Sequence, residues 1–451
     1  MVGLFAALAV VGTAGVGGGH GSTTVPLFTR QTGLTCAQCH VLFGAPVPNF
    51  TFTGKKFRMN GYRMPWISER IEAGEVGAIS GKRLALSSFP YLTLRYQSVF
   101  ASRSRTPGAT TWNPIISNPT SRLALFTGGA FGDNFGLWTE MYLVPPNGQA
   151  TGEWGLGMFT FDEYDLRFVK TDATKTLGLA FSNQGIAEVS GFGPWAPGGS
   201  QLNRGGLNGW NHPNKGQFFA YGWFKDRVFV SVGASPGQDN LDWARMNYLG
   251  QAAYWIFNSD AREMSVNVEW KAGNDDIPLL TNTNISTAAN TAPHWVYTDG
   301  VTGVSATRTA AASYVSKDLG DFNRVSGELR YGFIDRGPHS IETGLGYNVN
   351  SETYADNGKT KLSSFFGRVR YVYDRTYGLD LQVGKNTTYN FTDRTGLKHD
   401  IPAHTAYTAY FVFQPQMNII TSLQYSNTTT LRLDQAPLMG KSWSLGIDYL
   451  F

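Results

Sequence analysis

Beyond its N-terminal part, the chain repeatedly alternates apolar and polar residues with a period of two. In one such segment, Val266, Val268 and Trp270 share one parity, while Asn267 and Glu269 take the other. Successive side chains of a β-strand point to opposite faces, so this segment has one apolar face and one polar face. The pattern is typical of strands that face lipid on one side and water on the other.

The connections between these segments alternate in length. Short turns are followed by long stretches, notably 101–119, 184–215 and 273–321. Outer-membrane β-barrels are built in this way, with turns in the periplasm and loops outside the cell. Strands are predicted near 84–100, 120–130, 135–144, 160–169, 174–183, 216–224, 227–235, 246–258, 261–272, 322–334, 338–351, 361–374, 376–388, 402–414, 416–431 and 441–451, and turns at 132–134, 171–173, 225–226, 259–260, 335–337, 374–375 and Pro415.

The last predicted strand ends at the last residue. Trp443, Leu445, Ile447 and Tyr449 alternate with polar or small residues, and the chain stops at Phe451. A final amphipathic strand that ends in Phe resembles the C-terminal signal of bacterial outer-membrane proteins. An ordinary edge strand is the alternative, but such strands are usually protected by charge or by brevity. We therefore expect an all-β transmembrane barrel of about sixteen strands over residues 82–451, located in the bacterial outer membrane.

Composition agrees with this expectation. Charged residues make up 16% of the 451 residues and aromatic residues 14%, whereas soluble domains contain roughly 25% charged residues. Apart from the N-terminus, no apolar run approaches the roughly 20 residues that a membrane helix needs. The formal net charge of +4 is too small to indicate nucleic-acid binding. Residues 1–22 contain an apolar run followed by small residues, which predicts a signal peptide.

A Cys-x-x-Cys-His motif lies near the N-terminus. Cys36 and Cys39 are the only two cysteines in the chain, and His40 follows directly. This pattern is the signature of covalent haem attachment, in which two thiols bind the porphyrin and the histidine binds its iron. A thioredoxin-like dithiol would need a βαβ pattern, and a zinc site would need about four ligands. A disulfide across two residues would constrain little of the chain, so haem c is the expected cofactor.

The residues around this motif resemble a known family. The stretch 28–33, Phe-Thr-Arg-Gln-Thr-Gly, leads into the motif, and Gly54, Phe57 and the Asn-Gly-Tyr at 60–62 follow it. This arrangement resembles the outer-membrane monohaem cytochrome–porin fusions that include candidate iron oxidases of iron-oxidising bacteria. The resemblance implies a small cytochrome segment at 23–81 that plugs the barrel at its periplasmic mouth. It also implies oxidation of extracellular Fe(II) and electron transfer to a periplasmic c-type cytochrome or other electron carrier.

Several residues are weaker candidates for specific roles. Met59 or Met64 is the candidate for the second axial ligand of the iron, although methionine more often fills gaps in cores. Lys55, Lys56 and Arg58 would meet haem propionates, or would be solvated or pair with acids of the barrel interior. The charges predicted to face the barrel interior are Glu140, Glu163, Asp165, Arg167, Glu269, Arg330, Arg368 and Arg370. The candidate contacts for Fe(II) are Asp239, Asp242, Asp275, Asp276 and Asp299. Four histidines are not expected to be ligands: His20, His212, His294 and His404.

Two other functions stay open. Electrons could flow outward to an extracellular acceptor, because the direction depends on a haem potential that the sequence does not give. The barrel could instead be a solute-diffusion porin with an accessory haem segment. If the chain is an enzyme, it is an oxidoreductase of the iron-oxidase type.

Overall fold

The structure is a computed structural model of the chain. It describes residues 28, 32, 34, 36–40, 50–64, 78–80, 84–87, 92–105, 113–115, 120–131, 133–144, 160–183, 216–236, 246–274, 294–298, 305–309, 321–336, 338–353, 359–386, 389–392, 398–401, 404–416, 419–432 and 435–450. The predicted signal peptide and Phe451 therefore lie outside the described residues. So do seven positions that were considered as ligands: His20, His212, Asp239, Asp242, Asp275, Asp276 and Asp299.

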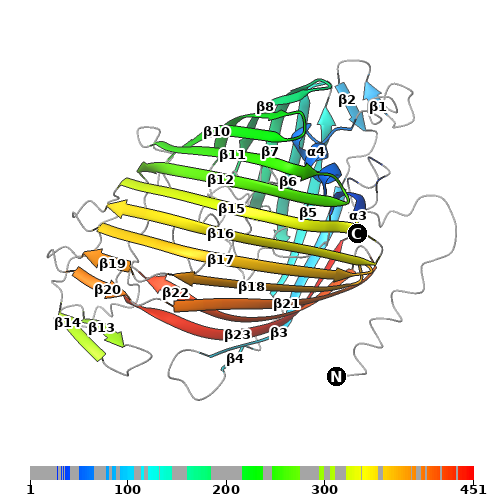
Figure 1. Cartoon of the computed structure of the whole chain (residues 1–451). Helices are drawn as coiled ribbons and strands as arrows, with labels where there is room; N and C mark the ends of the chain where they lie inside the picture. Colours follow the sequence, from blue (N-terminus) through cyan, green and yellow to red (C-terminus); the bar gives the residue numbers. More distant parts are fainter. Residues whose placement is uncertain are drawn as a thin grey trace, which may run out of the picture.

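Sixteen long antiparallel strands form one closed barrel in the described part of the chain (Figure 1). The last strand pairs with the first, for example through Tyr449 and Tyr96, so neither is an edge strand. The strands are β3 (Leu92–Arg105), β5 (Thr120–Phe131), β6 (Phe135–Val144), β7 (Thr160–Thr171), β8 (Lys175–Ser182), β9 (Gln217–Phe224), β10 (Val228–Pro236), β11 (Met246–Asn258), β12 (Arg262–Asn274), β15 (Asp321–Arg336), β16 (His339–Thr353), β17 (Lys359–Tyr373), β18 (Tyr377–Asn386), β21 (His404–Gln416), β22 (Ile419–Arg432) and β23 (Gln435–Leu450).

Shorter elements accompany the barrel. Three short strands extend its sheet, and two separate two-stranded sheets lie outside it. The strands that extend the sheet are β4 (Asn113–Ile115), β19 (Tyr389–Thr392) and β20 (Lys398–Ile401). The separate pairs are β1 (Ala78–Ser80) with β2 (Leu84–Ser87), and β13 (His294–Thr298) with β14 (Ser305–Thr309). The helices are α3 (Cys36–Cys39) and α4 (Phe52–Met59). In the part that the structure describes, no helix is long and apolar enough to cross a membrane.

The predicted barrel is confirmed, with local corrections. The first predicted strand, 84–100, is wrong as one element, because β2 pairs with β1 and the barrel sheet begins at Leu92. The predicted turn at Pro415 is displaced, since that residue belongs to β21 and the turn joins Gln416 to Ile419. Within the predicted long connection 273–321, His294 begins the short strand β13. The misplaced start of the first strand and the displaced turn have one cause. A period of two shows that a strand exists, but it does not show at which residue the hydrogen-bonded pairing with the neighbouring strand ends.

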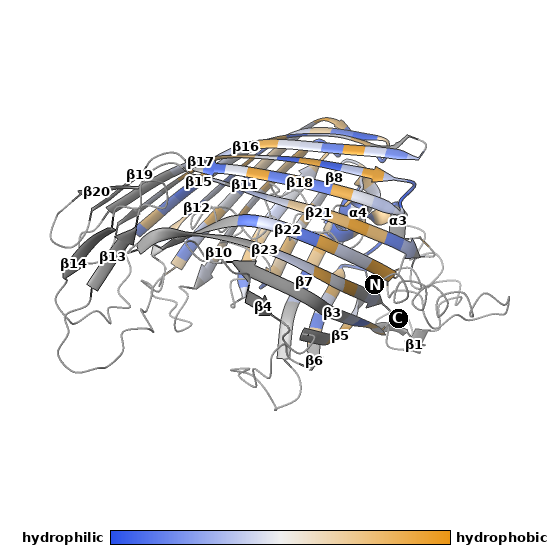
Figure 2. Cartoon of the chain, turned by 90° about the horizontal axis from the view of Figure 1, so that it is seen from below, coloured by the Kyte–Doolittle hydropathy of each residue, from blue (hydrophilic) through white to orange (hydrophobic). Residues whose placement is uncertain are grey.

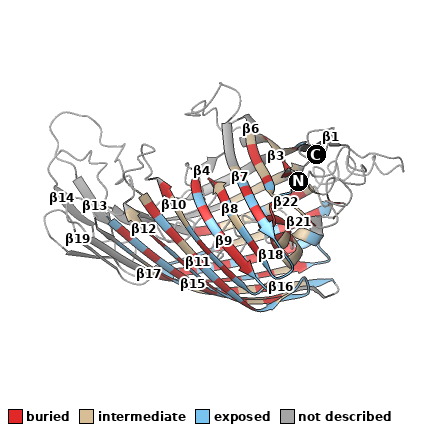
Figure 3. Cartoon of the chain, turned by 90° about the horizontal axis from the view of Figure 1, so that it is seen from above, coloured by how far each residue is buried: buried red, intermediate tan, exposed pale blue. Residues whose placement is uncertain are grey.

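The two faces of the wall separate as the alternation predicts. On β12, Val266 and Val268 are 43% and 45% exposed on the outside, whereas Asn267 and Glu269 are 4% and 0% exposed on the inside. Figure 2 shows hydrophobic and hydrophilic positions alternating along the strands, and Figure 3 shows the matching alternation of buried and exposed positions. A closed barrel with an apolar outer face leaves no unpaired strand edge in lipid. The predicted location in the bacterial outer membrane is confirmed by this architecture.

Helix α4 lies against the end of the barrel that carries the short turns. The backbone N–H and hydroxyl of Thr53 donate to the carboxylate of Asp260, in the turn between β11 and β12, at 2.9 and 2.8 Å. Lys56 pairs with Asp226, in the turn between β9 and β10, at 3.2 Å. Figure 1 shows α3 and α4 at the same end of the barrel as the C-terminus. Short turns are periplasmic in outer-membrane barrels, so the helical segment lies at the periplasmic mouth.

Two of these turns have the backbone of tight hairpins. Lys225 and Asp226 have φ angles of 48° and 56°, and Asp374 and Arg375 have φ angles of 48° and 53°. Two consecutive positive φ angles are typical of the type I′ turn, whose twist matches that of the flanking strands. The turn between β9 and β10 therefore holds Asp226 in a fixed position for its contact with Lys56.

Candidate functional site

The haem motif is part of a small unit made of α3 and α4. The two helices are joined by an antiparallel bridge between His40 and Phe50. The backbone N–H of Thr51 donates to the carbonyl of Cys39 at 3.0 Å, and its hydroxyl donates to the carbonyl of Gln38 at 2.5 Å. The same hydroxyl accepts a hydrogen bond from the N–H of Gly54 and so caps α4. Thr51 thus fixes the start of one helix against the end of the other.

Gly54 allows this close approach. A Cβ atom at this position would overlap the carbonyl oxygen of Cys39. Glycine is therefore required because the backbone of α3 lies directly against α4. This contact explains why a glycine stands in the first turn of α4, where it weakens the helix itself.

The donor groups of the motif suit a c-type haem. Cys36 and Cys39 are the first and last residues of α3, three positions apart, and positions three apart lie on one face of a helix. His40 follows at once and its ring lies 4.9 Å from that of Phe50. Burial of the imidazole, with the positive charge of Arg58, lowers the pKa of His40 to about 4. The motif thus places two cysteines at the two ends of one helical turn, followed directly by a histidine with a lowered pKa, and this order of residues fits a c-type haem.

A buried ion pair joins α4 to the barrel wall. The ammonium group of Lys55 lies 2.5 Å from the carboxylate of Glu263 on β12, and Lys55 is 0% exposed. The other carboxylate oxygen of Glu263 accepts from the indole N–H of Trp255 at 3.0 Å and lies 3.5 Å from Arg330. Burial lowers the pKa of Lys55, and the carboxylate of Glu263 acts in the opposite direction. Removing either partner would leave the other charge buried without its partner. The pair therefore stabilises α4 only in its observed position against the barrel wall.

A second buried cluster holds the end of α4. The hydroxyl of Tyr62 donates to the carboxylate of Asp165 on β7 at 2.7 Å. Arg58 lies 3.5 Å from the same carboxylate, and Arg167 lies 2.7 Å from it. Arg167 also donates to the carbonyl of Arg58 at 3.0 Å. Burial and the charge of Asp165 raise the pKa of Tyr62 above its ordinary value, so its phenol keeps the proton that it donates.

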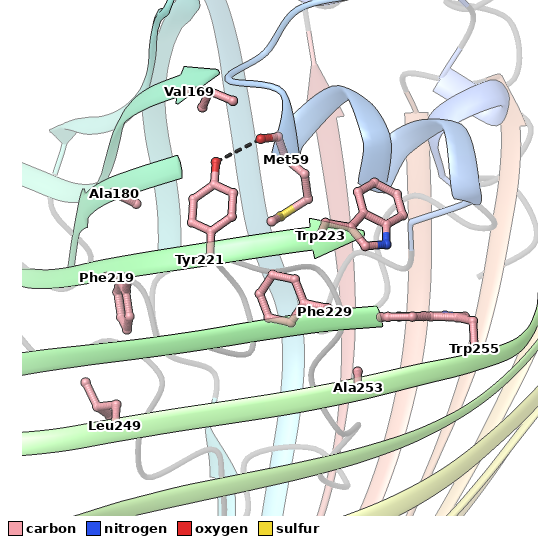
Figure 4. Packing of buried hydrophobic residues seen from close by; sticks show 10 residues of the cluster. All are labelled: Met59, Val169, Ala180, Phe219, Tyr221, Trp223, Phe229, Leu249, Ala253 and Trp255. Carbon is pink, nitrogen blue, oxygen red and sulfur yellow. Dashed lines mark hydrogen bonds between the residues drawn. The ribbon is translucent and has the colours of Figure 1, made fainter. Parts of the chain in front are cut away.

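Met59 belongs to the packing between α4 and the wall. Its side chain is 0% exposed in a cluster with Tyr221, Trp223 and Trp255, as Figure 4 shows. The hydroxyl of Tyr221 donates to the carbonyl of Met59 at 2.8 Å, and the guanidinium of Arg167 donates to its sulfur at 3.5 Å. The sulfur is therefore directed at the barrel wall.

Met64 lies in a different cluster. It is 4% exposed and packs with Phe57 and Tyr62, and Phe28 and Leu34 pack against this cluster. Phe28 begins the stretch 28–33 that leads into the haem motif, and Leu34 follows this stretch directly. Of the two candidate distal ligands, Met64 is thus the one that packs beside this stretch.

The basic residues of α4 are paired with acids of the barrel. Lys55 pairs with Glu263, Lys56 with Asp226, and Arg58 with Asp165. Of the roles expected from the sequence, pairing with acids of the barrel is the one that the contacts support: Glu263 and Asp165 are interior acids, whereas Asp226 lies in an exposed turn. Sequence reasoning missed Glu263, Tyr62, Tyr221 and Trp255 as anchors of the segment. The inward parity of Glu263 in its strand was the one available signal.

The inner wall continues this arrangement of charges beyond α4. The guanidinium of Arg370 lies 3.6 Å from the carboxylate of Glu342 and 3.0 Å from that of Asp380, which also pairs with Arg368. These side chains are at most 3% exposed. The predicted inward charges Glu140, Asp165, Arg167, Glu269, Arg330, Arg368 and Arg370 are all buried inside the barrel, and the side chain of Glu163 lies outside the described residues.

No family model matches the sequence, and no curated protein sequence matches it. Similar solved structures exist. OmpT, an outer membrane protein of Vibrio cholerae, aligns with a TM-score of 0.46 and 13% identity over 80% of this chain and 99% of that chain. The outer membrane channel DcaP of Acinetobacter baumannii aligns with a TM-score of 0.44 and 12% identity over 80% of this chain and 97% of that chain. OprB of Pseudomonas putida aligns with a TM-score of 0.45 and 11% identity over 80% of this chain and 94% of that chain. The fold of the present chain rests on its own strand pairing.

Proposed function

We propose that this chain is an outer-membrane electron-transfer protein that carries one haem c at the periplasmic mouth of its barrel. The observation that carries the proposal is the buried attachment of the haem-motif segment to the barrel wall, through Lys55 with Glu263 and Tyr62 with Asp165. A segment attached by buried ion pairs is held in one position rather than tethered loosely. A redox group fixed there would lie between the barrel interior and the periplasm.

Each part of the site has a role under this proposal. Haem c supplies one-electron redox chemistry when it is bound. Cys36 and Cys39 would hold it covalently, and His40 would bind its iron. The barrel wall positions the segment and limits access to it, which is what a protein contributes around a cofactor. The expected donor is extracellular Fe(II), as the family resemblance implies, and the expected acceptor is a periplasmic c-type cytochrome or other electron carrier.

Reconstitution in liposomes tests this function directly. The haem-loaded protein is inserted into vesicles that contain an oxidised c-type cytochrome, and Fe(II) is added outside under anaerobic conditions. We expect the enclosed cytochrome to become reduced with the unaltered protein and to stay oxidised with His40→Ala. Equal reduction with both proteins would overturn the proposal. Reduction of an external acceptor by an enclosed donor, without the reverse reaction, would establish outward transfer instead.

A solute-diffusion porin is the second candidate, and the lining of the wall favours it. Ser265, Asn267, Glu269 and Lys271 all face inward on β12, and hydrated interiors are typical of porins. Conductance in planar bilayers separates the two functions. A large, steady open channel in the haem-loaded protein would support diffusion, whereas near-silence would fit a barrel closed by its N-terminal segment.

A further inference from the structure

Three inward-facing side chains lie next to one another across β10, β11 and β12. Ser231 pairs in register with Gln251, and Gln251 pairs in register with Glu269. The three residues are 5%, 4% and 0% exposed. Figure 1 shows the three strands side by side in the wall. Their side chains therefore form a short row at one level of the barrel interior.

Hydrogen bonds determine how these groups are oriented. The amide nitrogen of Gln251 donates to the side-chain amide oxygen, Oδ1, of Asn267 at 3.0 Å and to one carboxylate oxygen of Glu269 at 3.2 Å. The amide nitrogen of Asn267 donates to the same carboxylate oxygen at 3.2 Å. The Oε1 atom of Glu269 thus accepts from both amide nitrogens, and an amide that donates through its nitrogen leaves its oxygen on the other side. The amide oxygen of Gln251 is thereby directed away from these bonds.

One oxygen on each of the three side chains has no hydrogen-bond partner among the described residues. These are the hydroxyl oxygen of Ser231, the amide oxygen of Gln251 and the Oε2 atom of Glu269, and each is buried. A buried oxygen without a partner costs free energy, and in native proteins it often marks the position of an ion or a bound water. Three such oxygens on consecutive register partners indicate a ligand that interacts with all of them.

The geometry of the sheet suits a metal cation. Neighbouring strands lie about 4.8 Å apart, which is roughly twice a cation–oxygen bond of 2.1 to 2.6 Å. A cation beside the central residue Gln251 would therefore lie one strand spacing from the strand of Ser231 and one from that of Glu269, and the longer Glu269 side chain would span most of the distance between these two. Carboxylate, amide and hydroxyl oxygens are the donors that hard divalent cations prefer. Glu328 pairs in register with Asn267 on the neighbouring strand β15. The nearest cation on β12, Lys271, lies over the ring of Phe322, with its nitrogen 5.6 Å from the ring centre.

We propose that Ser231, Gln251 and Glu269 bind one divalent cation of the kind that prefers oxygen ligands, on the inner wall of the barrel. The site is separate from the haem motif. Glu269 lies six residues beyond Glu263 on β12, roughly 20 Å along the strand from the anchor of α4. Cation binding at this position needs neither haem nor electron transfer, so it stands or falls independently of the proposed function.

Titration with Mn²⁺ tests the site in the full-length, detergent-purified protein. The protein is first treated with a chelator and dialysed, and free Mn²⁺ is then followed by its electron paramagnetic resonance signal. We expect one bound ion per chain, and an affinity at least about ten-fold lower in Glu269→Gln, because a charged ligand is lost. The control is Glu140→Gln on β6, which removes an inward carboxylate elsewhere on the wall and leaves binding unchanged.

Three results would overturn the proposal. They are the absence of a stoichiometric ion in the unaltered protein, unchanged binding in Glu269→Gln, and equal losses in Glu269→Gln and Glu140→Gln. Ser231→Ala provides a test that leaves the hydrogen bonds of the wall intact, because this hydroxyl makes none among the described residues. Weaker binding in this variant, with the mobility of the folded barrel retained in gel electrophoresis, supports the site, and unchanged binding counts against it.

Discussion

The ammonium group of Lys55 lies 2.5 Å from the carboxylate of Glu263, and this contact joins the haem-motif segment to the barrel across 208 positions of the sequence. Both side chains are buried. We expect Lys55→Met to weaken attachment of the segment by about 3 kcal/mol, because it leaves a carboxylate buried without its closest partner. Protease cleavage between the segment and the barrel, followed against denaturant concentration in the folded protein, measures this loss.

The neighbouring lysine provides the control for this prediction. Lys56 pairs with Asp226 at 3.2 Å, but the two side chains are 40% and 45% exposed. An exposed pair contributes about 0 to 1 kcal/mol, so Lys56→Met should hardly change cleavage. The double variant Lys55→Met with Glu263→Gln should recover part of the loss, since the carboxylate that had lost its lysine is then neutral, and the rest of the loss remains because Arg330 also loses its contact with Glu263. Equal effects of the two lysine variants would show that the buried pair does not hold the segment.

A second prediction concerns Gly54. A Cβ atom at this position would overlap the carbonyl oxygen of Cys39, whereas a Cβ atom at Gly327 on the wall has its nearest neighbour at 3.9 Å. We expect Gly54→Ala to separate α3 from α4 and to reduce the amount of covalent haem per folded barrel, and Gly327→Ala to leave it unchanged. Haem absorbance divided by protein concentration, after the barrel has been purified in its folded form, measures the effect. An unchanged ratio in Gly54→Ala would mean that haem attachment does not depend on this contact.

Two tyrosines give a third prediction. Tyr62 donates to the buried carboxylate of Asp165, and Tyr221 donates to the carbonyl of Met59. Hydrogen bonds to charged groups contribute about 1.5 to 3 kcal/mol, and those between neutral groups about 0.5 to 1.5 kcal/mol. Tyr62→Phe should therefore loosen the segment more than Tyr221→Phe in the same cleavage experiment. The opposite order would assign the main anchoring role to the cluster around Met59.

The sequence predicted the barrel better than the attachment of its N-terminal segment. Each strand can be recognised from its own residues. In β12, for example, Val266 and Val268 alternate with Asn267 and Glu269, and this alternation predicts a strand with one apolar face and one polar face. The ends of strands are less certain, and the split of 84–100 into β2 and β3 follows from pairing that no local pattern specifies.

The partners of α4 could not be read from the sequence for a different reason. Lys55 and Glu263 are 208 positions apart, and any inward carboxylate near a short turn could have met the lysine. The choice depends on the barrel's circumference and on where α4 enters it. Motif spacing places Cys36, Cys39 and His40 together because they are adjacent, whereas a distant contact has no local signature.

The last prediction separates the two candidate axial ligands. The sulfur of Met59 lies 3.5 Å from the guanidinium of Arg167 and packs against the barrel wall, whereas Met64 packs in the cluster that Phe28 and Leu34 adjoin. Methionine ligation raises the potential of a haem. We expect Met64→Leu to lower the midpoint potential of the haem-loaded protein, and Met59→Leu to leave it unchanged while weakening the packing of α4. A redox titration of both variants measures these midpoint potentials. A potential that falls only in Met59→Leu would contradict the prediction, because the sulfur of Met59 would then have to leave its position beside the guanidinium of Arg167.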